Sequence, residues 1–291
     1  SRRTAGFDLG NLPPFPRVRA DQNRKINEIV EEFKEAADFY RMEYSEDLMG
    51  MFRDFGCMLL LKCKVDTEGK ADLERLLEGR HKLKGTVKRQ LMTVSEELAQ
   101  LWEPGEQDGS GDTGEYEGSQ NVWEMFQTAL EEIFHFCLYS KGGKNRYLLP
   151  EETAKPLLRL LTFPEGMMAG NEGLVVLDTQ CGAGSALMAA SRYLKNLRLM
   201  GYEKDEEMWA AAVIMSQLSG LEMELHLEDG ARADLYESCD LVISNPVYGT
   251  DTIKDEELID QLPGELKTVR GRYHMELIRS MQALNFDGKA M

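Results

Sequence analysis

The stretch LVVLDTQCGAG, residues 174–184, decides the fold of this chain of 291 residues. Its four leading aliphatic residues predict a buried strand, and the glycines Gly182 and Gly184 predict a tight turn into a helix. Strands are expected over 174–178, 199–203, 222–227 and 241–245, and helices over 185–197, 206–219 and 274–284. This alternation with short turns predicts an α/β fold with a parallel, doubly wound sheet, whose ligands bind at the carboxyl ends of the strands.

The glycine turn has the composition of a nucleoside-binding turn. Because Gly182 and Gly184 lack a Cβ, a ligand can lie against their backbone, near the amides of the following helix. Glu203 ends the next expected strand, 19 residues after Gly184, and its carboxylate can accept two hydrogen bonds from a ribose diol. This pattern fits both S-adenosylmethionine and a dinucleotide, but the dinucleotide fingerprint has a third glycine where this chain has Leu187, which disfavours the dinucleotide. An ordinary strand–helix turn without a ligand is the alternative.

Four more residues complete the predicted cofactor site. Asp178 and Cys181 belong to the glycine turn itself. Asp229 follows the third expected strand and can accept a hydrogen bond from the adenine amine of the cofactor, although a solvated loop acid fits the same pattern. Tyr147 opens a helix entry that runs to Pro150, and this entry is expected to cover the methionine end of the cofactor.

The stretch SNPVYG, residues 244–249, closes the fourth expected strand and predicts a pocket for a planar amine. The side-chain oxygen of Asn245 and the backbone carbonyl of Pro246 can both accept hydrogen bonds from an amine, which aims the nitrogen lone pair at a methyl group. Tyr248 can stack on the ring that carries the amine. Transfer in such a pocket gains from orientation and proximity and needs no strong general base. In the alternative reading, Asn-Pro only starts a turn.

These motifs resemble the modification subunit of type I restriction-modification systems and, more broadly, the N6-adenine DNA methyltransferases. The resemblance covers roughly residues 120–291 and rests on 147–150, 177–184, 203, 229 and 244–249. It implies a Rossmann-like S-adenosylmethionine-dependent methyltransferase core, methylation of adenine N6 in DNA by base flipping, and a specificity subunit that reads the DNA sequence. The chain departs from the family pattern at Leu149, at Thr179-Gln180 and at Val247.

Composition divides the chain into four segments. Residues 1–20 hold three closely spaced prolines and predict an extended arm. Residues 21–104 predict a helical domain, which resembles, more loosely, the N-terminal helical domain of the modification subunits. Residues 105–119 hold five glycines and predict a flexible linker or loop. Residues 120–291 are the expected methyltransferase core. In the family that the chain resembles, this core continues beyond the position of residue 291, so we expect a truncated C-terminus. The expected inward side chains of the helical domain include Ile26, Ile29, Val30, Phe33, Ala37, Tyr40, Leu83, Val87, Leu91, Leu98 and Leu101.

The formal net charge of −17 limits any interaction with nucleic acid. Contacts from Lys and Arg to phosphates supply most nonspecific DNA affinity, so this chain is expected to bind DNA poorly alone, unless its basic residues cluster or a partner supplies the remaining contacts. The five cysteines form no CxxC pair, which indicates buried thiols in a reducing cytoplasm and disfavours a zinc site. No apolar run approaches the roughly 20 residues that span a bilayer.

Two other functions fit parts of the pattern. The Asn-Pro-x-Tyr pocket also serves methylation of protein glutamine amides, another planar nitrogen. A non-catalytic scaffold that kept the fold and lost the cofactor is the third hypothesis, and it is motivated by the departures near Thr179 and Leu149.

Overall fold

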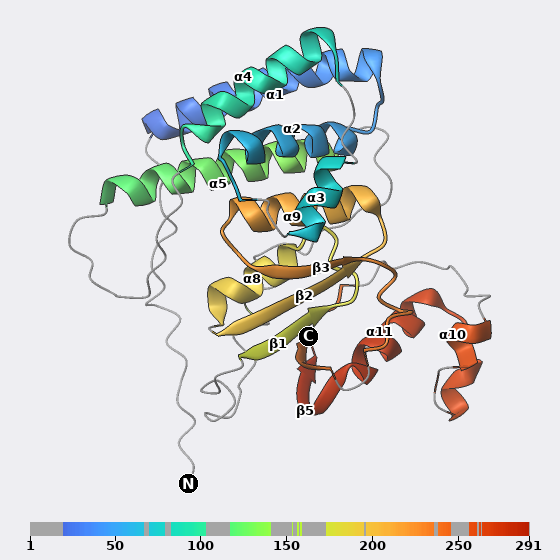
Figure 1. The fold of residues 1–291 in the computed structure, drawn as a ribbon. Helices are drawn as coiled ribbons and strands as arrows, with labels where there is room; N and C mark the ends of the chain where they lie inside the picture. The colour runs from blue at the N-terminus through green and yellow to red at the C-terminus, as the bar shows by residue number, and fades with distance from the viewer. Residues whose placement is uncertain are drawn as a thin grey trace.

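In a computed structural model of the chain, a layer of helices lies on one face of a parallel sheet (Figure 1). The structure describes residues 20–66, 70–78, 83–102, 117–140, 153, 156, 158, 173–194, 196–235, 238–245, 256–260, 262 and 264–290. The predictions made for the arm at 1–19, for most of the linker, and for Tyr147, Pro246 and Tyr248 lie outside these residues. Within the described part of the chain, no helix is long and apolar enough to cross a membrane.

Five helices make the upper layers of Figure 1, and the first four of them form the region predicted to be a helical domain. They are α1 (Ala20–Glu43), α2 (Met49–Lys62), α3 (Ala71–Glu78), α4 (Gly85–Ala99) and α5 (Glu117–Leu138). All of the inward side chains expected between Ile26 and Leu101 are buried. The start of α5 lies three residues inside the segment expected to be a linker, so residues 117–119 are helical.

The helical layers and the sheet share one hydrophobic core. In that core α1 packs on α4 and α5, and α2 packs on α9 (Glu206–Leu218), which covers the sheet. Aromatic pairs join the layers: the rings of Phe33 and Phe55 lie 5.0 Å apart, and those of Phe52 and Phe134 lie 5.1 Å apart. Because the buried cluster is continuous from α1 to the strands, the helical region supports the sheet directly.

The sheet has five parallel strands in the order β3-β2-β1-β4-β5. They are β1 (Leu174–Asp178), β2 (Leu197–Glu203), β3 (Met223–Leu227), β4 (Cys239–Val242) and β5 (Leu284–Ala290). The direction of the strand order reverses between β1 and β4, which is the switch point where doubly wound sheets bind their ligands. Helices α8 (Ser185–Tyr193) and α9 lie on one face, and α11 (Arg272–Gln282) lies on the other (Figure 1).

The C-terminal part differs from the prediction. The helix expected over 274–284 begins at Arg272 and ends at Gln282, and the residues after it form β5. The polar sequence LNFDGKA has few of the β-branched residues that favour strands, so its strand state comes from pairing with β4. The side-chain amide of Asn285 also donates to Asp240 in β4, at 2.9 Å. Two short helices, α10 (Glu256–Asp260) and a 3-10 turn at Gly264–Thr268, precede α11.

Candidate functional site

The glycine turn leaves β1 at the carboxyl edge of the sheet. Gly182 and Gly184 have φ angles of 55° and 79°, a left-handed region that glycine adopts without strain. The turn is fixed by two backbone bonds, from Cys181 N–H to the Tyr202 carbonyl (2.9 Å) and from Gly184 N–H to the Cys181 carbonyl (2.8 Å). The predicted tight turn between strand and helix is therefore confirmed, and Gly184 is the N-cap of α8.

Glu203 lies at the end of β2, beside this turn. Its Oε2 accepts a hydrogen bond from the Gly182 N–H (3.0 Å), and its Oε1 accepts one from the Asp205 N–H (2.7 Å). Burial raises the pKa of the Glu203 carboxyl, and the backbone donors counteract that rise. A carboxylate has about four lone-pair sites, so these two bonds leave capacity to accept hydrogen bonds from a ligand.

Asp178 and Cys181 are buried residues of the glycine turn. Asp178 is only 2% exposed, and its Oδ1 accepts a hydrogen bond from the Gln180 N–H at 3.0 Å. Burial raises its pKa to about 7, and the nearby charge of Glu203 adds to the rise. The Cys181 thiol is buried against Gly201, where an added Cβ would lie 2.8 Å from the sulfur. Burial also raises the pKa of this thiol well above its usual range. Direct contact of these two side chains with a cofactor stays a prediction.

The loop after β3 lies against the glycine turn. An ideal Cβ on Gly230 would come within 2.3 Å of the Thr179 carbonyl oxygen, so only glycine permits this approach. The neighbouring Asp229 carboxylate accepts a hydrogen bond from the Ala231 N–H (3.2 Å) and one from the guanidinium of Arg272 (3.0 Å). Asp229, which follows β3, therefore lies at the same edge of the sheet as Glu203.

Helix α11 contributes contacts that the sequence analysis did not anticipate. Arg272 joins Asp229, Arg279 donates to the backbone of the same loop, and the hydroxyl of Ser280 lies 2.8 Å from that of Thr179. The helix was expected from its periodicity, but its partners are 43 to 101 residues away in the chain. No local signal connects them, so only the fold reveals that α11 holds both the glycine turn and the loop after β3.

Asn245 follows β4 at the same edge of the sheet as the glycine turn. The Leu177↔Val242 register aligns β1 with β4, and the Ile243 N–H donates to the Leu177 carbonyl at 2.9 Å. Two residues further on, Asn245 is exposed. Because the carboxyl ends of parallel neighbouring strands lie at the same edge, Asn245 and the glycine turn both lie at the switch point. Its predicted partners in the amine pocket lie outside the described residues.

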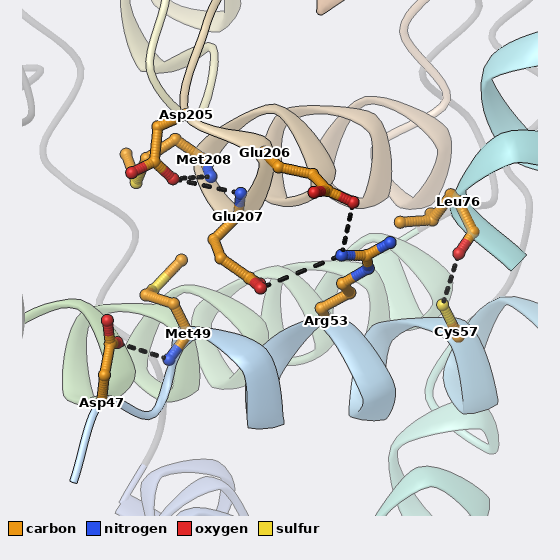
Figure 2. A network of polar contacts seen from close by, with 9 residues as sticks. All are labelled: Asp47, Met49, Arg53, Cys57, Leu76, Asp205, Glu206, Glu207 and Met208. Carbon is orange, nitrogen blue, oxygen red and sulfur yellow. Dashed lines mark hydrogen bonds and ion pairs between the residues drawn. The ribbon is translucent and has the colours of Figure 1, made fainter. Parts of the chain in front are cut away.

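A polar network connects the helical layer to the same edge of the sheet (Figure 2). The guanidinium of Arg53 on α2 lies 3.0 Å from a carboxylate oxygen of Glu206 and 3.8 Å from one of Glu207, both in the first turn of α9. Asp205 caps that turn by accepting from the N–H groups of residues 207 and 208, each at 3.1 Å. Since the Asp205 amide also donates to Glu203, the network reaches the predicted ribose contact.

A hollow of about 830 Å³ lies elsewhere, between α3, the end of α9 and the beginnings of β2 and β3. Its charged groups include Arg198 and Glu224, which pair with each other at 2.8 Å. Because this hollow lies at the amino ends of the strands, its position is unlike that of ligand sites in doubly wound sheets.

Comparison with solved structures defines the class. The chain is similar to a protein from Listeria monocytogenes described as a class I S-adenosylmethionine-dependent methyltransferase, with 16% identity and a TM-score of 0.59 over 92% of this chain and 72% of that one. It is also similar to the methyltransferase subunit of a type I restriction-modification system from Streptococcus thermophilus, with 16% identity and a TM-score of 0.51 over 91% and 74% of the two chains. The fold is therefore the Rossmann-like fold of S-adenosylmethionine-dependent methyltransferases, with a helical N-terminal region.

A family model matches part of the chain. The model of the N-6 DNA methylase family matches residues 126–270, which include the glycine turn, Glu203, Asp229 and Asn245. This part of the chain is therefore similar to the N-6 DNA methylases. No curated protein sequence matches the chain significantly.

Proposed function

We propose that the chain transfers a methyl group from S-adenosylmethionine to the N6 amine of adenine in DNA, as the modification subunit of a restriction-modification system. The observation that carries this proposal is that the glycine turn and Asn245 lie at one switch point of the sheet. The glycine turn supports a nucleoside site, and Asn245, which follows the neighbouring strand, supports an amine site. The match of residues 126–270 to the N-6 DNA methylase family favours adenine over other planar amines.

The polar groups at this edge fit S-adenosylmethionine by their chemistry. A ribose diol and an adenine amine are hydrogen-bond donors, and they need acceptors. Glu203 and Asp229 are the acceptors, each with part of its capacity already used by backbone donors. The left-handed glycines Gly182 and Gly184 keep side chains away from the turn between them. When bound, S-adenosylmethionine supplies an activated methyl group on a sulfonium.

On the acceptor side of the reaction, the chain orients an amine. An exocyclic amine is a weak nucleophile because its lone pair is delocalised into the ring. Hydrogen bonds from the amine to the Asn245 side-chain oxygen and to the Pro246 carbonyl would favour a pyramidal nitrogen and restore its lone pair. Tyr248 would stack on the flipped base. Orientation of this kind contributes through proximity, so no strong base is needed.

The negative net charge of the chain supports a partner subunit that makes most of the contacts with DNA. With a net charge of −17, the chain lacks the excess of basic residues that nonspecific DNA binding requires. A specificity subunit that grips the DNA would provide those phosphate contacts. We infer that the active form is a hetero-oligomer of modification and specificity subunits in the cytoplasm.

The test measures cofactor binding and methyl transfer separately. Calorimetric titration with S-adenosylhomocysteine gives the dissociation constant of the chain for the cofactor product. Transfer of a labelled methyl group to unmodified DNA, with and without a specificity subunit, is followed by chromatography of the nucleosides. N6-methyladenine supports the proposal. Label transferred to protein instead supports a glutamine methyltransferase, and a chain that binds no cofactor supports a non-catalytic scaffold.

Asn245→Ala and Glu203→Ala separate the two halves of the site. Asn245→Ala should lower transfer by about 10²–10³-fold, the usual cost of losing a group that orients the reacting atoms, while leaving the dissociation constant nearly unchanged. Glu203→Ala should weaken cofactor binding by about 1.5–3 kcal/mol, as expected for hydrogen bonds to a charged group. Asn285→Ala, which removes an amide on β5, is the matched control. Equal loss of binding and transfer in Asn245→Ala would contradict its assigned role.

A further inference from the structure

Arg272 occupies an unusual position between two acidic side chains. It is the first residue of α11, and its guanidinium donates through Nη2 to Asp229 Oδ2 (3.0 Å) and through Nε to Glu276 Oε1 (2.6 Å). Glu276 lies one turn further along the same helix and is only 2% exposed. The buried Glu276 carboxylate therefore holds the guanidinium at Nε, and Nη2 of the same guanidinium donates to Asp229.

The rest of α11 holds the backbone around Asp229 without touching its carboxylate. Arg279 donates to the carbonyls of Ala231 (3.0 Å) and Ala233 (2.8 Å), which fixes the course of the loop after β3. Ser280 meets Thr179 on the glycine turn. Among the contacts of α11 with this loop, the one to the side-chain carboxylate comes from Arg272, so its task differs from that of Arg279.

We propose that Arg272 is a positioning residue for recognition of the adenine ring of the cofactor. The Ala231 N–H takes one lone pair of Oδ1, and Arg272 takes one of Oδ2. With both oxygens anchored, the carboxylate cannot rotate, and its remaining lone pairs keep one direction. A fixed acceptor binds a ring amine at a lower entropic cost than a mobile one. It also rejects a purine without the amine, because the half-buried acceptor would then lack its donor. This inference rests on the proposed function.

The experiment compares two ligands rather than activities. S-adenosylhomocysteine carries the adenine amine, and the analogue built on purine riboside has hydrogen in its place. Calorimetric dissociation constants are measured for both ligands on the wild-type chain, Arg272→Met, Arg272→Lys and Arg270→Met. Arg270 is an exposed neighbour whose guanidinium bonds to the backbone carbonyls of Lys267 and Val269, so its substitution is the matched control.

The expected result is a selective loss. Arg272→Met should weaken S-adenosylhomocysteine about tenfold, the order expected when a charged hydrogen bond is lost, and leave the affinity for the purine analogue within about a factor of three, well below one such bond. Arg272→Lys keeps one donor and should recover part of the loss, while Arg270→Met should match the wild type. Because a general structural defect would weaken both ligands, the ratio of their affinities isolates the effect transmitted through Asp229.

Three outcomes would overturn the inference. They are equal weakening of both ligands by Arg272→Met, no change with either ligand, and a wild type that does not distinguish the two. If the wild-type chain binds neither ligand, the proposed function itself is wrong. Arg272→Met leaves the buried Glu276 carboxylate unpaired, so thermal unfolding is recorded for each variant. If this variant does not fold, Arg272→Met combined with Glu276→Leu removes both charges and carries the same comparison.

Discussion

Asp178→Asn should change how the stability of the protein depends on pH. Burial raises the pKa of Asp178 from its ordinary 3.8 to about 7. Between these two values the folded protein binds a proton that the unfolded chain releases, so the free energy of unfolding falls as the pH rises. At about 1.4 kcal/mol per pH unit, the wild type should lose about 3 kcal/mol from this group between pH 5 and pH 8. The carboxamide introduced by Asp178→Asn does not titrate, yet its oxygen can still accept from the Gln180 N–H.

Urea unfolding, followed by tryptophan fluorescence at pH 5, 6, 7 and 8, measures this effect. The free energy of unfolding of the variant minus that of the wild type should grow by about 3 kcal/mol across the range, with most of the change below pH 7, where the two titrations differ. Asp287→Asn, at an exposed position on β5, is the control and should give a nearly constant difference. A constant difference for Asp178→Asn, or one that shrinks with pH, would refute the reasoning that burial dominates this carboxyl.

Two further predictions concern packing around the site. Arg53→Met should change the free energy of unfolding by no more than about 1 kcal/mol. Arg53 is only 4% exposed, but its partners Glu206 and Glu207 are 60% and 25% exposed, so water can solvate them once the pair is broken. A loss above about 3 kcal/mol in urea unfolding would instead match a pair whose remaining partner is buried. Gly230→Ala should cost about 2–3 kcal/mol and weaken S-adenosylhomocysteine binding, because its Cβ would lie 2.3 Å from the Thr179 oxygen. Gly220→Ala, where nothing lies within 4 Å, should cost only the left-handed strain of about 1 kcal/mol. Equal costs for the two glycines would show that space at Gly230 is not limiting.

Much of the fold was predictable because its signals are local. The apolar run before Asp178 indicates a strand, and the spacing of inward residues in the helical region indicates helices. Each of these signals comes from residues that are close together in the chain. Strand β5 escaped prediction for the opposite reason. Residues 284–290 are polar, and their extended state depends on an edge of β4 that the local sequence does not contain. A strand of this kind is decided by pairing rather than by propensity.

For the candidate site, the sequence alone determined which residue types stand at the ends of which strands. Gly182, Gly184, Glu203, Asp229 and Asn245 could be named because each follows an apolar strand directly, and parallel strands bring such positions to one edge. The periodicity of residues 274–284 likewise indicated a helix, but it gave no partner for it.

Only the tertiary structure decided which side chains hold the site in place. Arg272 meets Asp229 across 43 residues, and Arg53 meets Glu206 across 153. Charged side chains carry no local mark of their partner, because an arginine on a helix surface has the same sequence pattern whether it faces water or a carboxylate. Their pairing follows from the packing of α11 and α2 against the α/β part of the chain, and that packing is set by the whole hydrophobic core.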